Sequence, residues 1–140
     1  MNLKIVIAQF YTSNVSYGNY SEEINKKYCD EQGYVYHVEK DDVKIKTELE
    51  GRSATWYKPK FIAEVFETHN PDYVLFLDAD AIVSDPTRRI EEFIDDNFNI
   101  ICTEDYGPSV INAGVFLLKN SDWTKMILKK WWDVCDTLTG

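Results

Sequence analysis

Two carboxylates follow an apolar run in the segment FLDAD (76–80), near the middle of the chain. One alanine separates Asp78 from Asp80, and in extended backbone residues two apart point to the same side. Two carboxylates that close together repel, so one would stay protonated unless a cation lay beside them. A hard divalent cation with oxygen ligands would remove this repulsion. The segment therefore predicts a metal site, and the alternative is that both acids only cap the following turn.

Strand-like and helix-like segments alternate along the rest of the chain. Apolar, β-branched runs predict strands, and apolar residues at helical spacing predict helices. The predicted strands are 4–11, 34–39, 73–78, 99–103 and 113–119, with 81–83 as a brief resumption of the third. Helices are predicted from Asn19 to Gly33, from near Pro59 to His69, over 85–95, and from Ser121 or Asp122 onward; 40–53 is predicted to be a charged loop with a short strand at 43–45. This order predicts an α/β fold with a mainly parallel, doubly wound sheet.

The acidic pair lies at the carboxyl end of the third predicted strand. Ligands of open α/β sheets bind in the crevice beyond these strand ends. Four apolar residues, 74–77, directly precede Asp78. This position favours a ligand site over a turn cap.

Haloacid-dehalogenase-like phosphatases also end an apolar strand in Asp-x-Asp, and they use the first Asp as a nucleophile. They usually place it on the first strand, with Thr or Val two residues after the second Asp, whereas here it follows the third strand and Ile82 holds the later position. Lys119 and the pair Asp95–Asp96 could supply the lysine and the acids that such enzymes need, but in the wrong order. A phosphatase is therefore the less favoured alternative.

Three segments together resemble one family of nucleotide-sugar glycosyltransferases. They are TWYKPKFIAEVF (55–66), with Trp-x-Lys before an apolar helix; PDYVLFLDADAIVSD (71–85), with Asp-x-Asp-Ala and a trailing acid; and INAGVFLLKNSDW (111–123), with Asn-x-Gly before an apolar strand. The family is the retaining one that includes yeast-type α-1,2-galactosyl- and α-1,6-mannosyltransferases and plant xyloglucan xylosyltransferases. Each motif alone is weak, but their order and spacing over residues 55–123 are specific.

This resemblance implies a GT-A fold, a Rossmann-like α/β sheet with flanking helices that binds a nucleotide diphosphate-sugar. It implies an enzyme, a hexosyl- or pentosyltransferase that moves a sugar from a UDP- or GDP-sugar to a glycan or other hydroxyl acceptor. Asp80 would ligate Mn²⁺ or Mg²⁺, and Asp78 would contact the metal or the donor ribose. The resemblance places Asn112 and Gly114 on the side of the donor sugar and the acceptor, and it places Ala8, Gln9, Phe10, Lys58 and Ala79 at the donor. The motifs assign no nucleophile for a retaining mechanism; Asp105 or Glu104 is the candidate that could face the reaction centre.

Composition limits the partners and the compartment. At 140 residues and 44% apolar, the chain is long enough for one domain over 1–140 with a packed core. Its net charge of −9 argues against a nucleic-acid partner. The absence of a signal peptide and of any long apolar run predicts a cytoplasmic protein, or one trimmed of its targeting parts. Three widely spaced cysteines predict buried free thiols, and the oligomeric state is open.

The resemblance is incomplete towards the C-terminus. GT-A enzymes commonly supply a late histidine as a further metal ligand, and this family also has a downstream Asp-Gln segment. His37 and His69 match neither and are predicted to be structural or exposed, and the chain ends at WWDVCDTLTG (131–140). We therefore expect a fragment, or a minimal enzyme that completes metal coordination with water and phosphate oxygens, or one that needs another domain or subunit. The alternative function is a catalytically incomplete domain that binds a nucleotide sugar or a partner protein.

Overall fold

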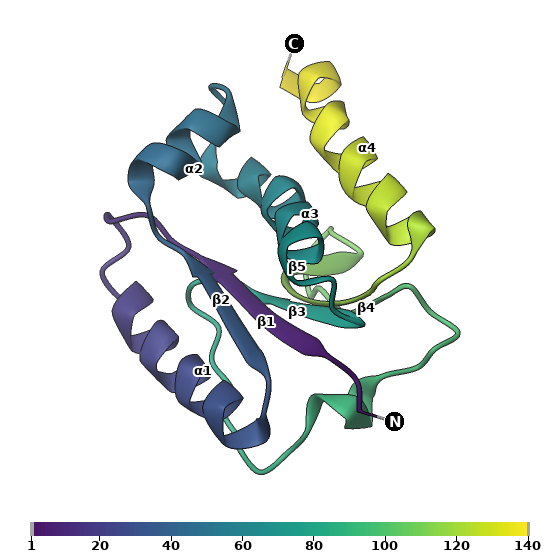
Figure 1. The fold of residues 1–140 in the computed structure, drawn as a ribbon. Coiled ribbons are helices and arrows are strands. Elements are labelled where there is room, and N and C mark those ends of the chain that lie inside the picture. Colours follow the sequence, from purple (N-terminus) through teal and green to yellow (C-terminus); the bar gives the residue numbers. More distant parts are fainter. Residues whose placement is uncertain (1, 140) are drawn as a thin grey trace.

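A five-stranded sheet forms the centre of the computed structural model, which describes residues 2–139 and their side chains as far as Cys135 (Figure 1). The strands are β1 (Ile5–Phe10), β2 (Val35–Glu39), β3 (Tyr73–Leu77), β4 (Ile100–Glu104) and β5 (Ile111–Lys119), in the order β2-β1-β3-β5-β4. β1 pairs in parallel with β2 and β3, whereas β5 runs antiparallel to both of its neighbours. Four strands therefore point the same way, and the predicted mainly parallel α/β sheet is confirmed.

Helices cover both faces of this sheet. They are α1 (Gly18–Gln32), α2 (Asp42–Leu49), α3 (Tyr57–His69) and α4 (Asp122–Thr139), with short 3-10 turns η1 (Ala54–Trp56) and η2 (Ile90–Phe93). α3 and α4 lie side by side over one face, and α1 lies on the other (Figure 1). Alternate strand residues divide between two cores: Val6 and Ala8 pack with α3, whereas Ile5 and Ile7 pack with α1. β1 is buried on both faces for this reason, as its continuous apolar sequence indicates.

Residues 42–49 form helix α2, so the predicted loop with a strand at 43–45 is wrong. The Asp41 side chain accepts hydrogen bonds from the backbone N–H groups of Val43 and Lys44, and so caps the helix N-terminus. Ile45 and Leu49, four residues apart, are the buried side chains of the helix. Two buried residues among charged ones are too few to give a clear helical period in the sequence.

The segment after β3 is also more irregular than predicted. Residues 81–83 do not resume a strand, and 85–95 holds only the 3-10 turn η2. Asp85 accepts hydrogen bonds from the backbone and the hydroxyl of Thr87, which turns the chain before a helix can begin. Ile90 is the buried residue of η2, so the segment lacks the apolar stripe of a longer helix.

The predicted C-terminal glycine of α1 is confirmed, but the predicted N-terminal cap is wrong. Gly33 follows the helix with a left-handed backbone (φ 80°), and its N–H donates to the Cys29 carbonyl. At the other end Asn19 is not the cap, because the helix begins at Gly18 and the Asn19 side chain contacts the Tyr11 hydroxyl instead. The first turn of α1 is therefore held by Tyr11, the residue directly after β1.

The three cysteines are free thiols, as predicted. Cys29 and Cys135 are buried and Cys102 is half-buried. Burial raises the pKa of the Cys29 thiol to about 12, so it stays protonated at neutral pH. Over residues 2–139, no helix combines the length and the apolar character that a membrane span requires.

Candidate functional site

Asp78 and Asp80 lie in a turn directly after β3. The strand ends at Leu77, and the Ala81 N–H donates to the Asp78 carbonyl at 2.9 Å, which closes the turn. The predicted strand was therefore one residue too long, and the extended geometry that would point both carboxylates to one side does not apply. Both side chains nevertheless line the same pocket, because the turn itself forms one of its walls.

This pocket, of about 230 Å³, lies where β1 and β3 end. Three separate segments line it: the end of β1 with the loop to α1 (Phe10, Tyr11, Thr12, Val15, Tyr17), the approach to α3 (Ala54, Thr55, Lys58), and the turn (Asp78, Ala79, Asp80). Parallel strands open such a crevice at their carboxyl ends, and ligands of open α/β sheets bind there. The structure thus brings five of the predicted site residues to one place.

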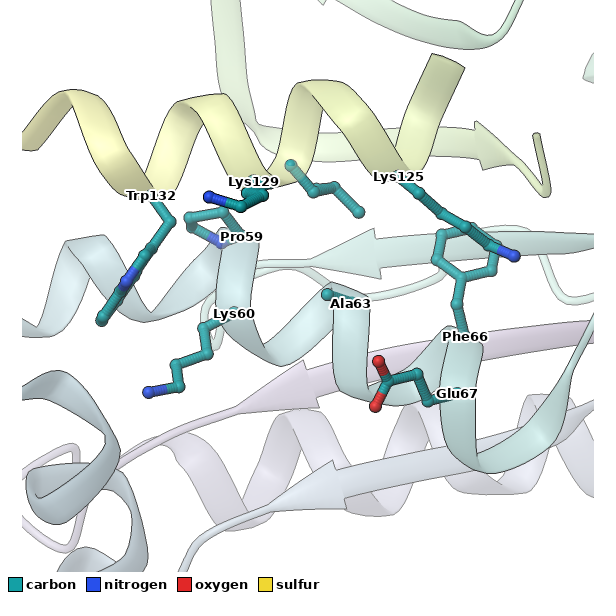
Figure 2. A pocket seen from close by; sticks show the side chains of 9 residues that line it. Pro59, Lys60, Ala63, Phe66, Glu67, Lys125, Lys129 and Trp132 are labelled. Atoms are coloured by element: carbon teal, nitrogen blue, oxygen red, sulfur yellow. The ribbon is translucent and has the colours of Figure 1, made fainter. Parts of the chain in front are cut away.

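Two other pockets are lined by none of the predicted site residues. One, of about 370 Å³, lies between α3 and α4, where Lys60, Lys125, Lys129 and Trp132 surround an apolar floor (Figure 2). The other, of about 410 Å³, lies under residues 82–93 on the opposite face of the sheet and is mainly apolar. The pocket at the turn is therefore the candidate site.

Lys58 joins the turn to β5. Its Nζ lies 2.8 Å from Asp78 Oδ1 and donates to the Ala113 carbonyl at 2.8 Å. The Lys58 side chain is only 12% exposed, so this contact is well shielded from water. By contrast, no side chain or backbone group among the described residues bonds to the exposed carboxylate of Asp80. One acid of the pair is thus compensated within the protein, and the other faces the pocket uncompensated.

Gly114 lets β5 pass directly beside Asp78. A Cβ at this position would lie 2.9 Å from Asn112 Oδ1 and 3.0 Å from Asp78 Oδ2. The glycine backbone is bonded to both neighbours, because its N–H donates to Asn112 Oδ1 at 2.7 Å and its carbonyl accepts from the Asp78 N–H at 2.8 Å. A Cβ would push the ends of the Asn112 and Asp78 side chains aside, so the glycine permits this close approach.

The other predicted residues are less directly placed. Ala8 and Gln9 have side chains that are 0% and 1% exposed, so they lie beneath the pocket, and of the first-strand residues only Phe10 lines it. Asn112 is half-buried beside Gly114, and Asp105 lies in the exposed loop between β4 and β5, outside the pocket lining. The predicted roles of these residues in donor binding and catalysis stay predictions.

Tyr11 forms a pocket wall that the sequence did not reveal. Its hydroxyl donates to Glu22 Oε2 at 2.5 Å, and the hydroxyl oxygen also lies 2.9 Å from Asn19 Oδ1. A Cβ on Gly18 would lie 2.4 Å from the Tyr11 ring, so that glycine makes room for the ring. Burial and the Glu22 carboxylate raise the pKa of Tyr11 to about 12, which keeps the hydroxyl a donor. The ring is therefore held in one orientation at the edge of the site.

His37 and His69 lie away from the pocket and contact each other. His37 Nδ1 on β2 is 2.8 Å from His69 Nε2 at the end of α3. Burial lowers the pKa of His37, and the neighbouring His69 and Lys44 lower it further, against the opposing charges of Glu64 and Glu39. Burial and the Lys4 ammonium lower the pKa of His69. At neutral pH the pair is therefore uncharged and shares one hydrogen bond.

This histidine pair predicts a loss of stability in acid. Unfolded histidines have a pKa near 6.5, and the folded values are lower, so the unfolded state binds more protons below pH 6.5. The contribution is complete above pH 6.5 and is lost as the pH falls through the folded pKa values. We expect the free energy of unfolding, from urea melts between pH 7.5 and 5.5, to fall more steeply for the native chain than for the double variant His37→Gln/His69→Gln. Equal slopes would contradict this assignment.

A family model described as "Protein of unknown function, DUF273" matches residues 25–139, which include the acidic turn, Lys58 and β5. The chain belongs to the DUF273 family. This DUF273 chain is 28% identical over 141 residues to the protein named "Probable alpha-1,6-mannosyltransferase MNN10" of Saccharomyces cerevisiae (strain ATCC 204508 / S288c). That match covers 81% of the DUF273 chain and 36% of the yeast protein.

Solved structures give the same fold. A glycosyltransferase involved in the glycosylation of the major capsid of PBCV-1 superposes with a TM-score of 0.78 at 22% identity, over 94% of the DUF273 chain and 66% of the other chain. The apo-form glycosyltransferase GlyE of Streptococcus pneumoniae TIGR4 gives a TM-score of 0.59 at 19% identity, over 96% and 39% of the two chains. The predicted resemblance to glycosyltransferases and the predicted fold class are thereby confirmed. The DUF273 chain spans about a third of its yeast relative and about two thirds of the viral one.

Proposed function

We propose that this chain carries the donor site of a metal-dependent glycosyltransferase, which moves a hexosyl or pentosyl group from a UDP- or GDP-sugar to a hydroxyl acceptor. The observation that carries the proposal is the pocket at the ends of β1 and β3, where Asp78, Asp80 and Lys58 meet the aromatic residues Phe10 and Tyr11. The likeness to the yeast mannosyltransferase supports a transferase over the phosphatase alternative.

The donor set of the turn fits a hard divalent cation. Carboxylate oxygens are the ligands that Mg²⁺ and Mn²⁺ prefer, and Asp80 presents them without a competing partner. Among the described residues no three His, Cys, Asp or Glu side chains converge on one point, so water and donor phosphates would complete the coordination of an ion held by Asp80 and Asp78. Such an ion, when bound, neutralises the charge that develops on the departing diphosphate.

The side chains around the turn would bind and orient the donor. Lys58 has three N–H donors, of which Asp78 and the Ala113 carbonyl take two, so one can reach a phosphate oxygen. Phe10 and Tyr11 offer ring surfaces on which a base can stack, and they exclude water from that side. Asn112, next to Gly114 on β5, would lie towards the sugar and the acceptor. Retention at the anomeric carbon is proposed from the sequence resemblance, and Asp105 is proposed only as a candidate to face the reaction centre.

We expect a UDP- or GDP-sugar to bind this chain only when Mn²⁺ or Mg²⁺ is present. Isothermal titration calorimetry with UDP-, GDP- and TDP-sugars, each with Mn²⁺ and then with EDTA, measures this dependence. Release of the nucleoside diphosphate in the presence of hydroxyl acceptors measures transfer. Absence of binding heat for every donor, with the chain folded and Mn²⁺ in excess, would reject the proposal.

The second candidate is a domain that binds a nucleotide sugar without transferring the sugar. Among the side chains that the structure describes, no third protein ligand lies beside the acidic turn, and a domain that only binds the donor would not need one. In that case the donor would bind with Mn²⁺ and no diphosphate would be released with any acceptor. Turnover by this chain alone would exclude it.

A further inference from the structure

Three polar side chains from three elements lie beneath the acidic turn. Gln9 is on β1, Asn25 on α1 and Tyr36 on β2, and the Gln9 and Asn25 side chains are 1% and 0% exposed. Amides this deeply buried are costly unless all their hydrogen bonds are made. We propose that these three residues form a clamp that positions the acidic turn for cation and donor binding, an inference that rests on the proposed function.

The clamp holds the backbone of the turn from below. Gln9 Nε2 donates to the carbonyls of Asp78 (3.0 Å) and Ala81 (3.2 Å). Asn25 Nδ2 donates to the same Ala81 carbonyl at 2.9 Å, and its Oδ1 accepts from the Val83 N–H at 2.9 Å. The clamp therefore binds the backbone of residues 78–83 at Asp78 and again at Ala81 and Val83.

A second layer of hydrogen bonds fixes the orientation of the clamp itself. The other Asn25 N–H donates to Gln9 Oε1 at 2.9 Å, and the Tyr36 hydroxyl donates to the same oxygen at 2.6 Å. Burial raises the pKa of Tyr36 far above its ordinary value, so the hydroxyl stays a donor. Since Gln9 Oε1 accepts two bonds, its Nε2 must face the turn. All four amide hydrogens are used, and a fully satisfied network specifies a single arrangement.

These residues act through the turn rather than on a ligand. None of the three side chains lines the pocket. In the turn that they hold, residues 78–83, Asp80 and Ile82 are exposed to solvent. The sheet ladder ends at Leu77, so it does not hold residues 79–83. Cation and donor binding need ligand groups placed to within a fraction of an ångström. Loosening the clamp should therefore weaken binding while the sheet stays folded.

The test compares Gln9→Met and Tyr36→Phe with the matched control Tyr73→Phe. Tyr73 also loses one hydroxyl bond, to Asp96, but it is buried and lies at the other end of β3. We expect the affinity for the Mn²⁺–donor pair to fall about 3- to 10-fold in Tyr36→Phe and about 10- to 100-fold in Gln9→Met, and to stay unchanged in Tyr73→Phe. Both tyrosine variants should lower Tm by a similar few degrees, so fold loss alone does not explain the difference.

Hydrogen exchange at the Ala81 and Val83 amides tests the clamp without any donor. We expect exchange there to be about 10-fold faster in Gln9→Met, while the amides of β1 and β3 keep their protection. Unchanged exchange in the folded variant would overturn the clamp. Faster exchange with unchanged donor affinity would overturn its positioning role. If the native chain binds no donor, the proposed function fails, and the exchange result still decides whether the clamp holds the turn.

Discussion

Replacing Asp80 with asparagine is expected to abolish cation-dependent donor binding and to leave the fold intact. Asp80 is exposed, and within the described part of the chain its carboxylate has no hydrogen-bond or ion-pair partner to lose. The substitution keeps the shape of the side chain but removes the charge that a divalent cation needs. We expect donor affinity in Mn²⁺ to fall at least about 100-fold, or about 2.7 kcal/mol, with Tm changed by less than about 2 °C.

The matched control for this variant is Asp30→Asn. Asp30 is exposed on α1 and pairs with Lys26 at 3.0 Å, a surface contact of small energetic effect. The change removes one negative charge from the chain without touching the pocket. Calorimetry should show full donor affinity for Asp30→Asn and none for Asp80→Asn. Similar losses in both variants would mean that net charge, not the turn, controls binding, and retained affinity in Asp80→Asn would reject Asp80 as a ligand.

The sequence placed the acidic pair correctly because the signals that place it are local. An apolar run of strand length ends at Leu77, and alternating strands and helices put that end at the ligand edge of a parallel sheet. Trp56 of the Trp-x-Lys motif is partly buried and packs against the core. The prediction that Lys58 lies near the donor came from the family motif, and the structure shows Lys58 in contact with Asp78.

Features that depend on contacts between distant residues were missed. Gln9 and Asn25 reach the turn across 69 and 56 positions of sequence, and side-chain amide hydrogen bonds leave no periodic pattern. The end of the third strand was predicted one residue too late for a different reason. Whether a strand ends at residue 77 or 78 is decided by where its ladder with β5 stops, and sequence patterns leave such boundaries uncertain by a residue or more.

Replacing Lys58 with methionine is expected to cost both stability and donor affinity. The change leaves the Asp78 carboxylate without its ion-pair partner and the Ala113 carbonyl without its donor. Because Asp78 is 36% exposed, water offsets part of this loss, and we expect about 1–2 kcal/mol in the free energy of unfolding. Donor affinity should fall about 30- to 100-fold, since the turn loses its link to β5 and the phosphates lose a cation. Urea unfolding and calorimetry measure the two effects.

Lys44→Met is the matched control, because Lys44 also bridges two acidic side chains away from the pocket. Its Nζ lies 2.6 Å from both Glu39 and Glu64, so its loss should lower stability and leave donor affinity unchanged.

The double variant Lys58→Met/Asp78→Asn then separates the two roles of Lys58. Removing the uncompensated charge should restore most of the unfolding free energy, because the cost came from an unpaired acid. If Lys58 also contacts the donor, affinity stays low in the double variant; recovery of affinity together with stability would mean that Lys58 serves only to hold Asp78.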